Sequence, residues 1–275
     1  MIPCNGFKTQ VLFFDVRISE TGMNQHLLFN FLIIGWFGLS VISFLILLVI
    51  PVPYGRHIRH GWGVTVKNQI GWLVMEAPSP IIFFFSFILG QNSKTVTTIA
   101  FLVMWEMHYV HRAFIYPFRL RGKEKRMPVT IMILGFMFNI INSFFIGHYL
   151  FSISDGYPNR WLMDPRFIFG FGLFLVGFVI NCQADYILCN LLRPGELNYK
   201  IPFGGLFRWI SCPNYLGEII EWVGWGVATW SLPSLTFAVW TAANLVPRSR
   251  FHHFWYHQHF PGYPLERKAL IPGLW

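Results

Sequence analysis

The sequence predicts an all-α integral membrane protein with seven transmembrane helices, an N-terminus outside and a C-terminus in the cytoplasm. Its 275 residues are 54% hydrophobic and 19% aromatic, but only 12% are charged. About 25% of the residues of an average soluble domain are charged, so the burial of one core does not account for this composition. The apolar residues also gather into segments of about 20, the length that an α-helix needs to cross a bilayer.

Seven apolar segments are candidates for the spans. They are Leu27–Val52, Ile70–Gly90, Thr95–Tyr116, Val129–Phe151, Phe167–Leu192, Leu206–Trp230 and Leu232–Val246. The first six are long enough to cross a bilayer, whereas the seventh has 15 residues and is ambiguous by its length alone.

The charge of the connections sets the number and direction of the spans. Four connections are basic, and they hold Arg56, Arg59 and Lys67; Arg119, Arg121, Lys123, Lys125 and Arg126; Arg193 and Lys200; and Arg248, Arg250, Arg267 and Lys268. The connections between them are neutral or nearly so. Basic loops stay in the cytoplasm. The N-terminal segment is neutral, the connections then alternate strictly between basic and neutral, and the C-terminal tail is basic, so the number of spans must be odd. We expect a multi-pass protein of the bacterial inner membrane or the endoplasmic reticulum.

The formal charge of +9 therefore lies mostly on the cytoplasmic face. Topology and anionic lipid headgroups explain part of it. The aromatic residues beside these charges, Tyr199 next to Lys200 and Tyr256 near Arg248, also suit a ligand that carries phosphates and a stacking base. No repeat or linker divides the chain, so we expect a single domain over residues 1–275.

The second segment carries an acid in an apolar context. Glu76 is followed within four residues by Pro78 and Pro80. A charged group at bilayer depth costs roughly 2.5–3.5 kcal/mol even on lenient scales, so it normally faces a cavity or a ligand. The prolines should break the helix there, which is tolerated where the freed groups line a cavity. Glu76 therefore marks a probable site.

The third segment carries a polar stripe. Tyr109, Arg112 and Tyr116 are spaced i, i+3, i+7 and share one helix face. The alternative for Arg112 is a snorkelling side chain near the cytoplasmic end. Tyr109 lies about a turn deeper, where an interfacial role explains it less well.

Acids and amides mark the fifth and sixth segments. Asn181 and Asp185 are spaced i, i+4, and Asn214, Glu218 and Glu221 form a second stripe after Pro213. Glu218 and Glu221 need cationic or hydrogen-bonding partners, and the candidate partners are Arg208 and the arginines of the C-terminal tail. Interhelical hydrogen bonding and a structural ion-pair network are the alternatives.

Histidine-based metal chemistry is a rival interpretation. His57 and His60, His108 and His111, and the group from His252 to His259 loosely resemble the histidine boxes of membrane di-iron enzymes. The match to those boxes is poor, so we expect no metal. No Rossmann or P-loop fingerprint is found, and we expect no nucleic-acid partner.

A series of ordered motifs resembles the steroid 5-alpha-reductases, and the chain is identified as a bacterial or distant homologue of that family. The resemblance covers roughly residues 70–275, is densest over 181–275 and is weak over 1–65. The motifs are Glu76-Ala-Pro-Ser, His108-Tyr-Val-His-Arg112, Asn181-Cys-Gln-Ala-Asp185-Tyr, Arg193-Pro-Gly-Glu, Tyr199-Lys-Ile-Pro, Asn214-Tyr-Leu-Gly-Glu-Ile-Ile-Glu221-Trp, Phe251-His-His and Arg267-Lys-Ala-Leu-Ile-Pro272.

The resemblance implies a seven-helix, NADPH-dependent reductase of the 4,5 double bond of 3-oxo-4-ene steroids. Glu76 and Tyr109 then correspond to the catalytic pair that engages the 3-ketone. The cofactor-binding positions are Asn181, Asp185, Tyr199, Lys200, Asn214, Glu218, Arg248, His252 and Tyr256, to which we add the basic residues Arg112, Lys123 and Arg193. Residues 181–275 form the main cofactor-binding half.

The chemistry of the residues agrees with this activity. Hydride addition to C5 of an enone builds negative charge on the carbonyl oxygen, which a protonated Glu76 and the Tyr109 hydroxyl can stabilise as donors. The surplus of Arg and Lys on the cytoplasmic side favours NADPH over NADH because it can hold an additional phosphate.

Other functions stay open at this stage. Within enzymes they are another membrane enone or sterol reductase, or a methyltransferase with an adenosyl cofactor; outside enzymes, a lipid or sterol transporter with proton-coupled acids. The expected partners are a steroid or related apolar enone and membrane lipid, and the expected state is a monomer.

Overall fold

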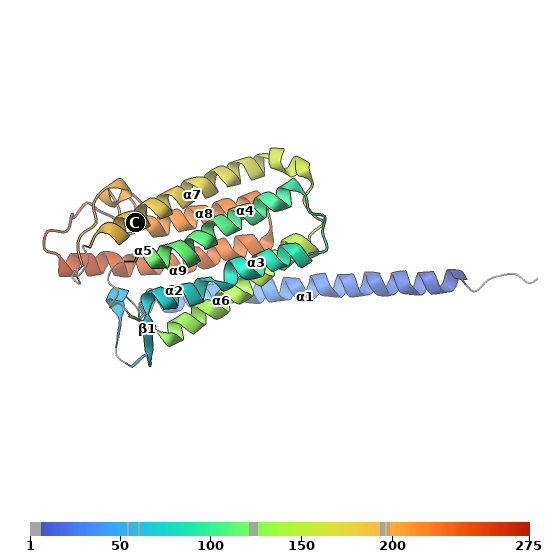
Figure 1. Cartoon of the computed structure of the whole chain (residues 1–275), viewed down its shortest axis with the longest axis horizontal. Helices are drawn as coiled ribbons and strands as arrows, with labels where there is room; N and C mark the ends of the chain where they lie inside the picture. Colours follow the sequence, from blue (N-terminus) through green and yellow to red (C-terminus); the bar gives the residue numbers. More distant parts are fainter. Residues whose placement is uncertain (1–6, 54, 60, 121–125, 193–195, 197–198) are drawn as a thin grey trace, which may run out of the picture.

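The computed structural model describes residues 7–53, 55–59, 61–120, 126–192, 196 and 199–275, with side chains from residue 26 onward. Most of the long helices run along a common direction, and α1 extends beyond the rest of the bundle (Figure 1). The α-helices are α1 (Phe7–Val49), α2 (Asn68–Glu76), α3 (Pro78–Leu89), α4 (Val96–Val110), α5 (Tyr116–Arg119), α6 (Val129–His148), α7 (Pro165–Asn190), α8 (Pro213–Thr229) and α9 (Leu232–His259). Strands β1 (Thr65–Lys67) and β2 (Arg126–Pro128) pair antiparallel.

Four helical segments in the described part of the chain are long and apolar enough to cross a membrane. They are His26–Val49, Asn68–Leu89, Val129–Ile153 and Pro165–Asn190, and they correspond to the first, second, fourth and fifth predicted spans. Large apolar side chains on these segments are exposed, among them Phe84 and Leu89 on α3 and Leu134 on α6. These surfaces suit contact with lipid. The other three predicted spans correspond to α4, α8 and α9, which do not meet the same requirement.

The helix around Glu76 is interrupted less than the prolines predict. α2 ends at Glu76 and α3 begins at Pro78, but Ala77 keeps a right-handed helical conformation and its N–H bonds to Leu73 O at 3.0 Å. Pro78 occupies the first turn of α3, where a missing N–H costs nothing. α2 and α3 therefore continue as one helical segment, with Glu76 at their junction.

The sixth and seventh predicted spans have wrong boundaries. The backbone N–H groups of Ser211 and Cys212 bond to the carbonyls of Lys268 and Ala269 in the C-terminal tail, at 2.8 and 3.1 Å. The helix therefore starts only at Pro213, rather than at Leu206. α9 in turn continues well past Val246, to His259, and its C-terminal half packs on the tail, where the ring of Tyr256 stacks on that of Tyr263 at 5.0 Å.

Glycines bring α7 and α8 into backbone contact. A Cβ on Gly170 would overlap the backbone of Ala228, and a Cβ on Gly177 would overlap that of Glu221. Gly217 on α8 faces the backbone of Asn181 in the same way. Small residues at such crossings permit the close approach of membrane helices. The contact fixes the acids of α8 against the polar residues of α7.

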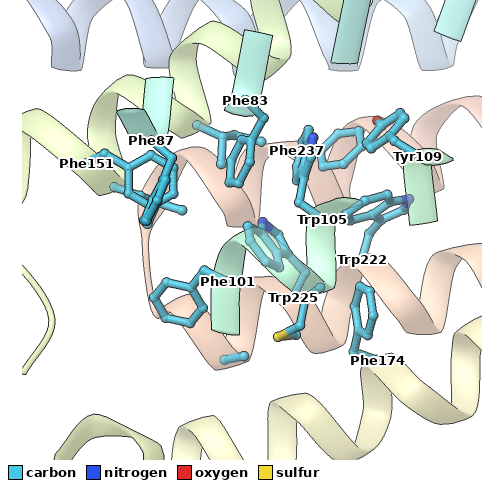
Figure 2. Close-up of a cluster of buried hydrophobic side chains, with 14 of the residues drawn as sticks. Phe83, Phe87, Phe101, Trp105, Tyr109, Phe151, Phe174, Trp222, Trp225 and Phe237 are labelled. Carbon is cyan, nitrogen blue, oxygen red and sulfur yellow. The ribbon is translucent and has the colours of Figure 1, made fainter. Parts of the chain in front are cut away.

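A cluster of aromatic side chains forms the core between α3, α4, α8 and α9. Trp105 stacks on Phe83 with ring centroids 4.4 Å apart, and it also contacts Trp222 and Trp225. Tyr109 lies at one margin of the cluster (Figure 2). Such packed rings are rigid, so this core holds the Tyr109 side chain in one orientation.

Candidate active site

A cavity of about 840 Å³ lies between α1, α2, α4, α6, α8 and α9. A volume of this size lies within the range of small-molecule and cofactor sites. Apolar residues of α1, α6 and the first half of α9 line one part of it, including Leu47, Phe138 and Trp240. Polar residues from the loop after α1 and from the end of α9 line the other part. One cavity therefore joins an apolar chamber to a polar arm.

Glu76 lies at the wall of this cavity and is held by an amide. Asn139 Nδ2 donates to Glu76 Oε2 at 3.1 Å and to Met75 O at 2.8 Å. Asn139 Oδ1 accepts a hydrogen bond from Ser79 Oγ at 2.9 Å, which fixes the orientation of the amide. The other carboxyl oxygen, Oε1, has no hydrogen bond to a described residue. Asn139 therefore holds the carboxyl group of Glu76 through Oε2 and leaves Oε1 available to a ligand.

Tyr109 reaches the same cavity from α4. Its side chain is 3% exposed, and its ring lies 4.8 Å from that of Trp105 and 5.7 Å from that of Trp222. Glu76 and Tyr109 come from different helices but share one cavity wall, which gives two potential hydrogen-bond donors beside an apolar chamber.

Arg112 is the centre of the buried charges. Its Nη1 lies 2.9 Å from Asp185 Oδ2 and its Nη2 lies 3.7 Å from Glu218 Oε2. The guanidinium also packs over the rings of Trp72 and Tyr116, at 4.5 and 4.7 Å. The expectation that Arg208 and the tail arginines pair with Glu218 and Glu221 is wrong. Arg112, in the turn that follows α4, lies next to Glu218, and His108 pairs with Glu221.

The backbone around Arg112 is itself unusual. Residues His111–Ile115 form a π-helical turn between α4 and α5. Such turns often occur at functional sites because they redirect side chains. Tyr109, Arg112 and Tyr116 all line the cavity, as expected for a stripe on one helix face.

Asn181 and Asp185 lie behind the cavity wall rather than on it. Asn181 Nδ2 donates to Asn214 O at 3.0 Å, and Asn214 Nδ2 donates to Asp185 Oδ1 at 3.3 Å. Asn214 and Glu218 themselves line the cavity. The α7 pair therefore bonds to Asn214 of the wall without itself lining the cavity, and its predicted role in cofactor binding stays a prediction.

The polar arm is built on the end of α9. Arg248 Nη1 donates to Asn244 Oδ1 at 2.8 Å and Nη2 donates to Tyr215 OH at 3.2 Å. His252 Nε2 lies 2.9 Å from the same hydroxyl, and its Nδ1 lies 3.2 Å from His57 Nε2. Burial, together with the positive charge of nearby Arg56 and Arg59, lowers the pKa of His57 to about 4. His57 is therefore neutral near pH 7, so its contact with the ring of His252 adds no positive charge from His57 to the arm.

Arg56 is a site residue that the sequence analysis missed. Its guanidinium packs over three rings, those of Tyr199 at 5.1 Å, Trp255 at 4.8 Å and Tyr256 at 4.5 Å. Nη2 donates to Tyr256 OH at 3.2 Å, whereas Nη1 is buried without a hydrogen-bond partner among the described residues. Its position in a basic loop was the available signal, but loop charge does not distinguish Arg56 from its neighbours.

Asn139 was also missed, and His108 and Glu221, which were named separately, were not predicted to pair. His108 Nδ1 lies 2.8 Å from Glu221 Oε1. Glu221 therefore turns away from the cavity that its neighbours Asn214 and Glu218 line.

The remaining predicted residues divide into two groups. Tyr199, Lys200 and Tyr256 line the polar arm, and Lys200, whose side chain is 44% exposed, pairs with Glu196 at 2.5 Å. Lys123 and Arg193 lie outside the described residues. Within the described part of the chain, no three His, Cys, Asp or Glu side chains come together as metal ligands would.

Comparison with known proteins gives a consistent result. Residues 125–275 match the family model of 3-oxo-5-alpha-steroid 4-dehydrogenase. A steroid 5-alpha-reductase of Gossypium hirsutum is 36% identical over 252 residues, which cover 90% of this chain and 98% of the relative. The 3-oxo-5-alpha-steroid 4-dehydrogenase 1 proteins of Bos taurus and Homo sapiens are 38% and 40% identical, over 86% and 80% of this chain and 93% and 85% of those relatives.

Proposed function

The chain belongs to the 3-oxo-5-alpha-steroid 4-dehydrogenase family, and from this membership we propose that it reduces the 4,5 double bond of 3-oxo-4-ene steroids with NADPH. It is an oxidoreductase that acts on CH–CH bonds and uses a nicotinamide cofactor, as its family does. The observation that carries the proposal is the single cavity that joins an apolar chamber, with Glu76 and Tyr109 on its wall, to a cationic and aromatic arm.

The chamber suits a fused apolar ring system. Its wall has aliphatic and aromatic side chains from α1, α6 and α9, and the two polar groups Glu76 and Tyr109 lie together rather than scattered. A 3-oxo-4-ene steroid has the same division, with an apolar body and one ketone at its end. We assign the ketone to the Glu76 and Tyr109 pair, because a buried carbonyl oxygen requires hydrogen-bond donors.

The bound cofactor supplies a hydride that adds to C5. Negative charge then develops on the ketone oxygen, and the chain must stabilise it. Glu76 in its protonated form donates from Oε1, while Asn139 holds Oε2 at 3.1 Å. Tyr109 donates from its hydroxyl, with its ring held by Trp105 and Trp222. Donors that are already fixed in a site shielded from water stabilise such charge strongly.

The polar arm fits a phosphorylated dinucleotide. The buried Nη1 of Arg56 lacks a partner among the described residues, and a phosphate oxygen would satisfy it. Arg248 and Lys200 add positive charge, and His252, Asn214 and Glu218 add hydrogen-bonding groups. The ring of Tyr199 provides a face for a base, whereas the ring of Tyr256 is covered by Arg56 and Tyr263. Lys123 and Arg193, outside the described residues, remain predicted ligands of this group.

The topology is part of the proposal. We assign seven spans to a single domain over residues 1–275, with the N-terminus outside and the cofactor arm on the cytoplasmic side of the endoplasmic reticulum or the bacterial inner membrane. The support is the location of Arg56, Lys200 and Arg248, three members of basic connections, around one arm. Membrane lipid then surrounds a monomer.

Purified protein in detergent tests the proposal. NADPH consumption is measured with a 3-oxo-4-ene steroid, with the matched 4,5-saturated 3-oxo steroid, and with NADH in place of NADPH. We expect consumption only with the unsaturated ketone, a 5α-reduced product by mass and NMR analysis, and a preference for NADPH. Protein that binds NADPH but reduces none of a panel of 3-oxo-4-ene steroids would contradict the assignment of the substrate.

A further inference from the structure

The buried pair of His108 and Glu221 has no part in binding the ketone as described above. His108 Nδ1 and Glu221 Oε1 lie 2.8 Å apart, on α4 and α8. His108 is 4% exposed and Glu221 is fully buried. The second oxygen of Glu221, Oε2, is buried without a hydrogen-bond partner among the described residues. A pair with only a packing role would be expected to satisfy this oxygen.

The unpartnered oxygen indicates how the proton is distributed in the pair. A carboxylate whose second oxygen is buried and unpartnered is strongly disfavoured, whereas a neutral carboxylic acid tolerates an unpaired carbonyl oxygen better. Glu221 therefore donates an O–H from Oε1 to His108 Nδ1. A neutral imidazole that accepts at Nδ1 carries its own proton at Nε2.

His108 lies beside the group that binds the ketone. It precedes Tyr109 in α4, the two rings are 4.9 Å apart between centroids, and both residues line the cavity. His108 Nε2 has no hydrogen bond to a described residue. In the substrate, C4 is bonded to the carbon that carries the ketone oxygen. A group next to Tyr109 is therefore suited to reach C4.

We infer that His108 is the acid that protonates C4 and that Glu221 is the positioning residue that resupplies its proton. The inference rests on the proposed function, because it assigns the second half of the same reaction. Reduction of the double bond requires one hydride at C5 and one proton at C4, and the pair supplies that proton from a site shielded from bulk water.

The step balances in atoms and charge. The electron pair between C3 and C4 of the enolate forms the new C4–H bond while the His108 Nε2–H bond breaks, and the ketone at C3 is restored. The Glu221 proton passes from Oε1 to Nδ1, so the imidazole stays neutral in its other tautomer. Glu221 takes up the negative charge that leaves the enolate only as a short-lived carboxylate, because its buried Oε2 favours the acid, and a proton from water then restores that acid.

Reaction in D2O tests the inference, with NMR analysis of the label at C4 of the product. A fixed acid delivers deuterium to one face of C4 in the wild-type protein. In His108→Gln we expect turnover to fall by about 10²-fold, within the range for the loss of a general acid, and the label to appear on both faces. His111→Gln is the matched control, because His111 lies on the same stretch of helix but does not line the cavity.

Glu221→Gln keeps a hydrogen bond to Nδ1 but has no acidic proton to pass on. We expect it to slow turnover while the label stays on one face. NADPH binding, followed by fluorescence, identifies any variant that fails to fold.

The proposed function and the inferred role of His108 are contradicted by different results. Wild-type protein that binds NADPH and reduces no 3-oxo-4-ene steroid removes the proposed function. Active wild-type protein with a His108→Gln variant that still labels a single face, at any rate, removes the inference, because a packing role alone changes the rate and not the source of the proton.

Discussion

At the scale of single residues, Glu76 has the sharpest test. Glu76→Gln keeps a donor and nearly the same shape, and Asn139 can still hold its amide oxygen, whereas Glu76→Ala removes the donor. If Glu76 acts as a neutral donor, the Gln variant keeps measurable turnover and the Ala variant loses roughly 10²–10³-fold in kcat, the usual cost of one oxyanion donor. Steady-state kinetics with a 3-oxo-4-ene steroid measure both. Equal losses in the two variants would exclude the donor role.

Tyr109→Phe removes one hydroxyl from a side chain that is 3% exposed and changes almost no volume. The packing with Trp105 and Trp222 should survive, so any effect reports on the hydrogen bond. If that bond strengthens as charge develops on the ketone oxygen, kcat and kcat/KM fall together. A normal kcat with only a raised KM would show instead that Tyr109 holds the steroid, which leaves Glu76 alone to polarise the ketone.

Arg56 permits a comparison with a close neighbour. Arg56 is enclosed by three aromatic rings, whereas Arg59 in the same loop is exposed. Arg56→Gln should weaken NADPH binding by at least tenfold in a fluorescence titration, because a stacked cation whose Nη1 is the proposed donor to a phosphate is lost. Arg59→Gln should leave the affinity nearly unchanged. Equal effects in the two variants would indicate a general effect of loop charge rather than a contact with a phosphate.

The sequence identified most of these residues by type and spacing but not by partner. Spacing predicts that Asn214 and Glu218 share a helix face, and both line the cavity. It does not predict that Glu221 turns to His108, or that Arg112 rather than Arg208 meets Glu218. Contacts between helices depend on crossing angle and rotation, which periodicity within one helix does not contain.

At the scale of elements, the contact between α7 and α8 sets the geometry of the site. A Cβ on Gly177 would overlap the backbone of Gly217 and Glu221, whereas Gly172 on the same helix has open space. Gly177→Ala should therefore push the helices apart and lower the midpoint of thermal unfolding, with a cost of roughly 1–3 kcal/mol. Gly172→Ala should be neutral or slightly stabilising, because alanine favours the helix. Thermal unfolding in detergent compares the two, and equal midpoints would contradict the close contact.

Element boundaries show where sequence reasoning fails for a physical reason. The start of α7 at Pro165 follows from Asp164, which accepts a hydrogen bond from Arg166 N at 2.9 Å and caps the helix. Hydrogen bonds to Arg166 lower the pKa of Asp164 to about 2, so this cap stays ionised above that pH. The start of α8 depends instead on pairing with Lys268 and Ala269. Contacts between segments so far apart in sequence leave no local signal.

At the scale of the whole molecule, length and apolar composition identify four helical segments as candidate spans, but they do not identify α4, α8 and α9 as spans. The four segments that meet the length and composition requirement carry exposed apolar side chains. α8 has a mostly buried surface that includes Glu221 and Trp222, and α4 continues through the turn at Arg112 toward Arg119. Helices that face protein and a cavity do not need an apolar surface. α4 has 15 residues and α8 has 17, and their failure to meet the length and composition requirement is therefore compatible with seven spans.

Labelling of single cysteines distinguishes the possible topologies. Arg59, Asp155 and Glu266 are exposed and lie in different connections, so Arg59→Cys, Asp155→Cys and Glu266→Cys are made separately in protein without its native cysteines. With seven spans and the N-terminus outside, an impermeant maleimide reaches only Asp155→Cys in intact cells or sealed vesicles of matching orientation. Four spans with the N-terminus outside would expose only Glu266→Cys, and four with the N-terminus inside would expose both Arg59→Cys and Asp155→Cys. Each alternative also moves a basic connection to the outer face, against the positive-inside rule. We therefore expect Arg59→Cys and Glu266→Cys to react only after permeabilisation, as the proposed cytoplasmic location of the cofactor arm requires.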